Sequence, residues 1–373
     1  TMLFTVVLAF PYAYGIVRSK MPGGTIFRLI AILPLLAPSM LQGIGLIYLF
    51  GNQGLFTTGF FGYLPRFDLE IYGALGIVIA EVAYAFPQAV LIFIVGLSMT
   101  DYRLYEAANM LGAGSIRTFF TVTLPSVRYS LTSALFITFT TCFVDFGAPK
   151  IIGGQYSVIA TELYKQVVGQ QKLNMGAAVG LILLVPAVLS FFVDRVMSRK
   201  RSESVGSGSI PYQIKSNSLR DWGYFSYCTV LSTMILALIG AIILAATIKN
   251  WPYDLSFTTQ HFNFDLASSG GMSSLLLSLE MAAWTAVFGT LLVFLNAYSI
   301  EKLRMLRVVR QLNYLFSLVP LALPGLVVGL AYIFFFNRAG WTIESIGLFI
   351  KNPFHVLYGT LAILVLSNII HYY

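Results

Sequence analysis

Long apolar runs separated by short polar stretches dominate the pattern along this chain. A helix needs about 20 apolar residues to cross a bilayer. Several runs contain prolines, among them Pro34 and Pro38, but neighbouring helices can satisfy the backbone groups that proline leaves unpaired, so we expect the spans to stay intact. The pattern predicts an all-α, polytopic helical bundle with nine spans, of which the first and last are incomplete: 1–16, 26–50, 73–99, 128–149, 176–197, 223–248, 274–300, 312–336 and 356–373.

The composition supports a membrane protein and excludes a soluble one. Hydrophobic residues make up 57% of the 373 residues and charged residues only 10%, whereas soluble domains average about 25% charged residues. The lipid bilayer is therefore the expected surrounding. The two cysteines, Cys142 and Cys228, both lie in apolar runs. They predict packing positions and neither a disulfide framework nor a metal site.

The basic residues predict the orientation of the spans. Of the 23 Lys and Arg residues, 16 fall in alternate loops, and positive charge is retained on the cytoplasmic side. These loops, which include 105–126 and 199–221, are therefore expected to face the cytoplasm. The stretch 199–221 is polar and rich in Ser and Gly, which is typical of a flexible linker.

The two halves of the chain resemble each other at nearly the same offset, and the matched prolines and glycines share one offset. Residues 1–16 align without a gap on 285–300, and residues 33–54 align on 319–340, each 286 or 284 positions further along. Matched spans lie six apart, so both copies point the same way, as in a parallel tandem repeat. We predict a first repeat at 1–198, a linker at 199–221 and a second repeat at 222–373. The pairs at an offset of 286 are Pro34 with Pro320, Pro38 with Pro324, Gly43 with Gly329, Gly54 with Gly340 and Gly73 with Gly359.

A polar stretch between two apolar runs, "YEAANMLGAGSIRTFFTVTLPS" at 105–126, carries the most specific pattern. Small, helix-favouring alanines follow Glu106, which suits the first turn of a helix. Gly112 and Gly114 predict a tight turn, and Leu124-Pro125 ends a second short helix before the next span. An ordinary amphipathic loop helix on the membrane surface is the alternative.

This stretch resembles the EAA loop of the inner-membrane permeases of binding-protein-dependent ABC importers (type I). The matching residues are Glu106, Ala107, Ala108, Gly112, Leu124 and Pro125, with Val122 at a position where the family has Ile. The resemblance implies a helix that docks on a cytoplasmic ATP-binding subunit, present as a dimer, and a periplasmic substrate-binding protein as a second partner. It also implies the bacterial inner membrane as the location.

The offset places a second copy of the loop near position 392, past Tyr373. We therefore expect a fused, two-repeat permease, truncated at its N-terminus and before its second EAA loop. Fused permeases of this layout resemble those for ferric iron, thiamine and 2-aminoethylphosphonate. The run 145–171 resembles the phosphonate-type members most.

The chain has none of the sequence patterns that mark the main classes of enzyme. The phosphate-loop pattern G-x-x-x-x-G-K-[ST] is missing, as are G-x-S-x-G, H-E-x-x-H and C-x-x-C. We therefore expect no catalytic residues, no metal site, no cofactor and no nucleic-acid partner. ATP hydrolysis is expected on a separate subunit.

Ionisable groups inside spans are costly and mark candidate substrate paths. Glu81, Asp145, Glu280 and Asn368 are candidates to line such a path. Lys150, Lys165 and Lys172 would bias the outer vestibule toward an anion such as a phosphonate. The alternative is that the carboxylates form interhelical hydrogen bonds and the lysines are only solvated.

Two other classes of function remain open. A secondary transporter also uses parallel repeats and places ion-coupling carboxylates in the membrane. The EAA-like loop favours the ABC permease, because a secondary transporter needs no docking helix. No sequence feature supports a structural or assembly subunit.

Overall fold

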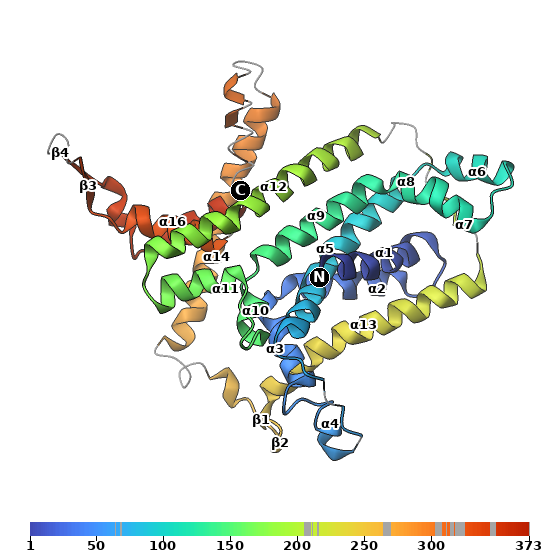
Figure 1. Cartoon of the computed structure of the whole chain (residues 1–373), viewed down its shortest axis with the longest axis horizontal. Helices are drawn as coiled ribbons and strands as arrows, with labels where there is room; N and C mark the ends of the chain where they lie inside the picture. Colours follow the sequence, from blue (N-terminus) through green and yellow to red (C-terminus); the bar gives the residue numbers. More distant parts are fainter. Residues whose placement is uncertain are drawn as a thin grey trace. The chain divides into compact units, whose positions relative to one another are not determined.

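The computed structural model describes residues 1–63, 65–67, 69–204, 210, 212–214, 216–263, 270–302, 308–310, 312–313, 317, 325–343 and 348–372. It divides into two compact units, each described below by itself. The first comprises Thr1–Thr161 and Leu189–Thr258, and the second comprises Glu162–Val188 and Thr259–Tyr373. The described residues are mainly helical, as Figure 1 shows, which confirms the predicted class of an all-α helical membrane bundle.

The first unit is a bundle of helices joined by short helical turns (Figure 1). Two helices, α11 (Ile159–Tyr164) and α12 (Leu173–Ser204), run across a unit boundary. The other elements of this unit are α1 (Met2–Arg18), α2 (Gly24–Ile32), η1 (Leu33–Leu36), α3 (Ser39–Phe50), α4 (Gly59–Gly62), α5 (Ala74–Ser98), α6 (Tyr102–Met110), α7 (Ser115–Thr118), η2 (Phe119–Thr123), α8 (Leu124–Ser126), α9 (Arg128–Val144), α10 (Gly147–Ile152), α13 (Ser218–Thr247), β1 (Ile248–Asn250) and β2 (Asp254–Phe257).

Helix α5 is the centre of this bundle, since it packs on α1, α3 and α9. Small side chains on α5 allow this close approach: Ala80, Ala85 and Ala89 are fully buried. A Cβ atom added at Gly96 would lie 2.6 Å from the Cβ of Ser130 on α9. Packing of small residues is what holds membrane helices together, because lipid offers no hydrophobic driving force between them.

The predicted span 26–50 is wrong as a single helix. It is broken into α2 with η1 and then α3, and the two parts are bent by 105°. Ala37 adopts an extended conformation between Pro34 and Pro38, as expected for a residue whose helical conformation clashes with a following proline ring. The prolines at positions 87 and 186, by contrast, lie inside the continuous helices α5 and α12, as predicted.

The predicted span 128–149 also differs from the structure, because α9 ends at Val144. Asp145 is extended, and the short helix α10 follows it. Four described helices are long and apolar enough to cross a membrane, and two bent helix pairs meet the same criterion together. Most of the predicted span 312–336 before Gly325, with Pro320 and Pro324, lies outside the described residues.

The internal repeat recurs in the secondary structure at the same offset. Helix α3 covers Ser39–Phe50 and α16 covers Gly325–Phe336, so both their first and last residues are 286 positions apart. Gly73 and Gly359 share that offset, and both have positive φ angles, of 98° and 78°. Each precedes a helix, α5 and α17 respectively. A position that needs the left-handed conformation favours glycine, so the aligned glycines have the same backbone role.

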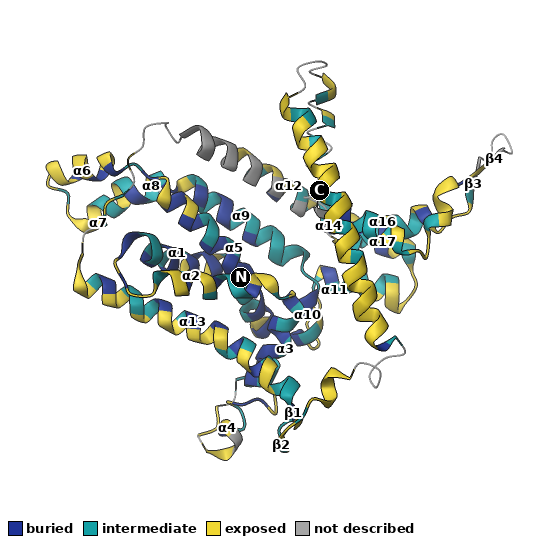
Figure 2. Ribbon diagram, turned by 180° about the vertical axis from the view of Figure 1, so that it is seen from behind, coloured by how far each residue is buried: buried dark blue, intermediate teal, exposed yellow. Residues whose placement is uncertain are grey.

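The second unit contains α14 (Gly271–Lys302), which packs on α17 (Leu361–Tyr372), and α16, which also packs on α17. Figure 2 shows α14 exposed along most of its length. The short elements of this unit are η3 (Lys165–Gly169), η4 (Gln260–Phe262), β3 (Gly340–Ile343), β4 (Leu348–Lys351) and η6 (Pro353–Leu357).

Two antiparallel β-hairpins lie in the loops that the charge pattern places outside the cytoplasm. One pairs β1 with β2 and the other pairs β3 with β4. In the first, the side-chain and backbone hydrogen bonds from Ser256 hold the pKa of Asp254 below its usual value. The Trp251 indole N–H also donates to the Gln53 carbonyl (2.8 Å), which attaches this hairpin to the loop after α3.

The compact units do not coincide with the predicted repeats, because α13 packs on α1, α2 and α3. A repeat is defined by sequence and a compact unit by packing, so the boundaries at 198 and 222 stay a prediction. Helix α12 continues to Ser204 and α13 begins at Ser218, so helical residues occupy both ends of the predicted linker.

We predict that Gly96→Ala destabilises the protein by about 1–3 kcal/mol, because the added methyl group overpacks the contact between α5 and α9. Thermal unfolding of the purified protein in detergent measures the effect. The matched control is Gly240→Ala on α13, where an added Cβ meets no atom within 4 Å. The second change Ser130→Gly should restore most of the loss. Equal stability of the two single variants would contradict the prediction.

Candidate functional site

The helix α6 carries the Glu-Ala-Ala residues of the sequence motif and presents two different faces. Asp101 precedes its first residue, and the Asp101 carboxylate accepts the backbone N–H of Arg103 (3.0 Å) and so caps the first turn. Glu106 is the fifth residue of α6, so the prediction that it lies in the first turn is wrong. Tyr102, Tyr105 and Ala108 are buried. Their spacing of three residues places them on one side of the helix, which therefore packs against the protein.

The opposite face of α6 is exposed. Glu106 and Ala107 both lie on it, whereas Ala108 is buried beneath it. Figure 2 shows α6 and α7 largely exposed. Large apolar side chains are exposed around this face, with Met110 at 90% and Ile116 at 78% exposure, together with Leu104, Leu111 and Phe120. We call these five residues the apolar rim. Exposed apolar side chains gathered around one small polar feature are typical of a protein interaction site.

Gly112 ends α6 in a Schellman motif. The backbone N–H of Ala113 donates to the carbonyl of Ala108 (3.0 Å), and that of Gly112 donates to the carbonyl of Asn109 (3.0 Å). Gly112 has a φ of 69°, the left-handed conformation that glycine adopts without strain. Gly114 has a φ of −67°, which any residue can adopt. The turn predicted from two glycines therefore requires glycine only at position 112.

The second arm of the motif, α7 to α8, packs back on α6. The Tyr105 hydroxyl donates to the Thr123 hydroxyl oxygen (3.1 Å). Thr123 is buried, Val122 and Leu124 are half-buried, and Pro125 is exposed. The second short helix ends at Ser126, directly after Leu124-Pro125, and α9 follows at an angle of 64°, so the predicted end of this helix is confirmed. The structure thus brings the motif residues into one compact helix–turn–helix.

A second group of predicted residues forms a buried polar cluster in the first unit. Asp145 accepts hydrogen bonds from the Ser39 hydroxyl (2.6 Å) and from the backbone N–H of Ala148 (3.0 Å). Ser39 is the first residue of α3 after the break at Pro38. The Asp145 carboxylate therefore joins the start of α3 to the start of α10.

Glu81 on α5 interacts electrostatically with Asp145 and lies within reach of the Cys142 thiol. Its side chain is 1% exposed, and neither carboxylate oxygen has a hydrogen-bond partner among the described residues. A buried carboxyl group without a donor is costly. Gln88 lies seven residues after Glu81 on α5, and its Oε1 accepts a hydrogen bond from the Thr141 hydroxyl of α9 (3.1 Å). The α5–α9 interface thus contains a polar seam, defined here as Glu81, Gln88, Thr141, Cys142 and Asp145.

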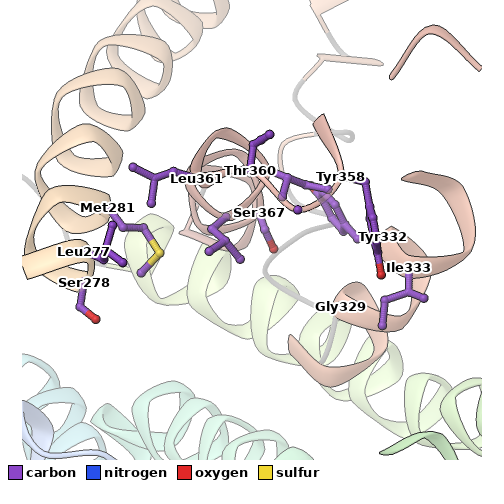
Figure 3. Close-up of a pocket in the computed structure, with 13 residues that line it drawn as sticks. Leu277, Ser278, Met281, Gly329, Tyr332, Ile333, Tyr358, Thr360, Leu361 and Ser367 are labelled. Carbon is purple, nitrogen blue, oxygen red and sulfur yellow. The ribbon is translucent and has the colours of Figure 1, made fainter. Parts of the chain in front are cut away.

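The other two path candidates, Glu280 on α14 and Asn368 on α17, belong to the second unit. Glu280 is exposed and accepts a long hydrogen bond from the Trp284 indole (3.4 Å). This unit contains a cavity of about 710 Å³, lined by residues of α14, α16, α17 and the turn before α17. Figure 3 shows the residues that line it. Glu280 and Asn368 are not among the residues that line it, and its wall is mainly apolar.

Sequence reasoning did not predict two residues of the polar cluster, Ser39 and Cys142, as site residues. Ser39 gave no signal, because a serine in an apolar run is common. Cys142 was assigned to packing, although it lies three residues before Asp145, a spacing that places both on one face of a helix. No group of three or more His, Cys, Asp or Glu side chains that could hold a metal ion occurs in the described part of the chain.

Residues 5–203 match the family model of the binding-protein-dependent transport system inner membrane component. The match covers more than half of the chain. The chain belongs to this family. The predicted resemblance to importer permeases is therefore confirmed. The matched residues of this inner membrane component include the whole helix–turn–helix, Glu81 and Asp145, whereas Glu280 and Asn368 lie beyond them.

The chain is similar to several curated transport permeases. It is 27% identical over 351 residues to the ferric transport system permease protein FbpB of Actinobacillus pleuropneumoniae, covering 91% of this chain and 51% of that protein. It is 26% identical to the putative ferric transport system permease protein FbpB 1 of Haemophilus influenzae, covering 91% and 55%. The chain thus spans about half the length of these two relatives.

A shorter relative matches only part of the chain. The molybdenum transport system permease protein ModB of Escherichia coli is 26% identical over 212 residues, covering 55% of this chain and 90% of that protein. The three relatives are named as transport permeases and not as enzymes, in agreement with the expectation that the protein is not an enzyme.

We predict that Ser39 and Asp145 are energetically coupled. Asp145→Asn should destabilise the protein by about 1.5–3 kcal/mol, because it weakens hydrogen bonds to a charged acceptor. Ser39→Ala should have a smaller effect, and the double variant should lose less than the sum of the two. A double-mutant cycle of thermal unfolding measures this coupling, and strictly additive losses would contradict it.

Proposed function

We propose that this protein is the membrane-spanning permease subunit of an ATP-driven importer in the bacterial inner membrane. In this proposal a periplasmic binding protein delivers the solute, and a dimer of cytoplasmic ATP-binding subunits supplies the energy. The observation that carries the proposal is the exposed helix–turn–helix at 102–126. Its Glu106–Ala107 face and apolar rim lie in the part of the chain that matches the importer family.

The chemistry of α6 supports docking on a partner. Ala107 is small and exposed, so a partner surface can approach the helix backbone closely. Glu106 offers a carboxylate to a basic group of the partner, and the apolar rim offers area to bury. The Schellman turn at Gly112 fixes the direction in which the chain leaves this face.

Transport in this proposal follows from the movement of the docking helix. Closure of the two ATP-binding subunits pulls on α6, and the packed bundle around α5 transmits the movement to the membrane. The break at Pro38 provides two short segments, η1 and α3, that can shift relative to each other more easily than one continuous helix. Asp145 accepts a hydrogen bond from Ser39 at the start of α3, so a shift of α3 would change the contacts of the polar cluster.

We propose ferric iron, or another hard cation of this kind, as the transported solute. The two ferric permeases match 91% of this chain, whereas ModB matches 55%. The carboxyl groups of the buried Glu81 and the half-buried Asp145 provide oxygen ligands that suit a hard cation. We propose these two residues, with Glu280 and Asn368 of the second unit, as residues of the translocation path.

A 2-aminoethylphosphonate permease is a second candidate, favoured by one observation. Lys150, Lys165 and Lys172 are all exposed, so they can attract an anion to the predicted outer side. A secondary transporter is the third candidate, because the buried Glu81 is the kind of group that couples transport to protons. Uptake measured after collapse of the proton gradient separates the two classes. An importer should still transport the solute as long as ATP and the binding protein are present, whereas a secondary transporter should not.

We predict that Gly112→Val impairs coupling to the ATP-binding subunit. A β-branched residue in the left-handed conformation costs more than about 1–2 kcal/mol, so the Schellman turn should open and misplace α6. The protein should still insert in the membrane, but co-purification of the ATP-binding subunit and uptake should each fall about tenfold. Gly114→Val is the matched control, because Gly114 has an ordinary φ angle. Normal uptake by Gly112→Val would argue strongly against a docking role for α6.

We predict that Glu81→Gln slows uptake without destabilising the protein. The variant replaces a buried carboxyl group, which has no hydrogen-bond partner among the described residues, by an amide of nearly the same shape, so stability should change little. Uptake of ferric iron by cells that carry the complete transporter should fall about tenfold or more, since the path loses one carboxyl ligand. ATP hydrolysis measured alongside identifies any loss of coupling. Unchanged uptake would remove Glu81 from the proposed path.

A further inference from the structure

Arg18, the last residue of α1, is a buried cation at the predicted cytoplasmic end of the bundle. Its side chain is 1% exposed. One guanidinium nitrogen, Nη2, donates to the Leu97 carbonyl near the end of α5 (2.8 Å). The other two nitrogens, Nε and Nη1, have no hydrogen-bond partner among the described residues. Burial of a charge at such a position requires another source of compensation.

Two tyrosine rings provide that compensation. The Arg18 Cζ atom lies 3.8 Å from the ring centroid of Tyr212 and 5.0 Å from that of Tyr105. The faces of aromatic rings are electron-rich and attract a cation. The two rings also contact each other edge-to-face, with centroids 4.9 Å apart. Tyr105 belongs to α6 and Tyr212 to the predicted linker, so one guanidinium joins α1, α5, α6 and the linker.

The linker residues around Tyr212 are attached to α6 by further contacts. The backbone N–H of Tyr102 donates to the Ile210 carbonyl (3.0 Å). The backbone N–H of Ile210 in turn donates to the Asp101 carboxylate (3.3 Å), the same group that caps α6. The Tyr102 and Tyr212 rings lie edge-to-face at 5.5 Å. A segment that composition assigns to a flexible linker is thus bound along the start of the docking helix.

We propose that Arg18, Tyr105 and Tyr212 form a joint that transmits movement of α6 to the ends of α1 and α5. We call these three residues the arginine joint. The inference rests on the proposed function and adds a role for the linker, with Tyr212 as a positioning residue. When the ATP-binding subunits pull on α6, Tyr105 displaces the Arg18 guanidinium. Because Arg18 is the last residue of α1 and donates to the Leu97 carbonyl, this displacement reaches the ends of both α1 and α5. Tyr212 covers the other face of the guanidinium and keeps it seated.

The variant Tyr212→Ala tests this inference in the full-length permease, reconstituted with its ATP-binding subunits and binding protein. ATP hydrolysis is measured with and without the binding protein and ferric citrate. Loss of one ring face should reduce the stimulated rate about threefold to tenfold. The unstimulated rate and the amount of bound ATP-binding subunit should stay within about twofold, because α6 keeps its cap and its Schellman turn.

Two further variants complete the test. Tyr212→Phe keeps the ring and should retain stimulation. If the hydroxyl group were the important feature, Tyr212→Phe would lose stimulation as Tyr212→Ala does. Trp222→Ala removes an exposed ring at the start of α13 in the same unit and should have no effect. Full stimulation in Tyr212→Ala would overturn the inference, and so would an equal loss of stimulated and unstimulated rates. A wild-type complex that the binding protein does not stimulate would overturn the proposed function and this inference with it.

Discussion

The close packing of α5 against α1, α3 and α9 is the contact on which the rest of the first unit depends. It is made by small residues, because Ala80, Ala85, Ala89 and Gly96 leave room for the neighbouring helix backbones. In a bilayer such packing must supply the stability that the hydrophobic effect supplies in water. The position of every functional group in this unit is therefore set relative to one helix.

Helix α5 contributes to the polar cluster near its first turns and to the Arg18 contact near its last residue. Glu81, in its first half, faces Asp145, and the Leu97 carbonyl, near its last residue, accepts the Arg18 guanidinium. Helix α5 continues through Pro87. A continuous, tightly packed helix can carry a displacement from one end to the other with little loss, because packed interiors deform little. One continuous helix thus connects the polar cluster with the Arg18 side chain that contacts Tyr105 of α6.

The sequence predicted those features that depend on local backbone chemistry. Gly112 and the helix before it were predictable, because a left-handed C-terminal turn requires glycine. The break at Pro38 was not predicted, since a single proline is tolerated in other spans, as Pro87 shows. What differs is the extended Ala37 between two prolines. The outcome depended on whether the neighbours could satisfy the lost hydrogen bonds, which a single sequence does not reveal.

Contacts between distant segments were beyond sequence reasoning. Glu81 and Asp145 were each selected as costly groups in a span, but their proximity follows from the pairing of α5 with α9. Arg18 counted only as one more basic residue that sets topology. Its partner Tyr212 lies 194 positions further along, in a stretch whose composition indicates flexibility. Composition describes the average of a segment, and two anchoring residues, Ile210 and Tyr212, do not change that average.

Glu81 and Asp145, the two carboxyl groups of the polar cluster, differ in their hydrogen-bond partners. Asp145 has two hydrogen-bond donors that fix the starts of α3 and α10, and structural stability alone can account for it. Glu81 has no hydrogen-bond partner among the described residues, although it is 1% exposed and thus more deeply buried than the half-buried Asp145. A glutamine or an alanine would be cheaper at that position. Ionisable groups that cost stability inside a membrane bundle often have a functional role, so the proposed path depends more on Glu81 than on Asp145.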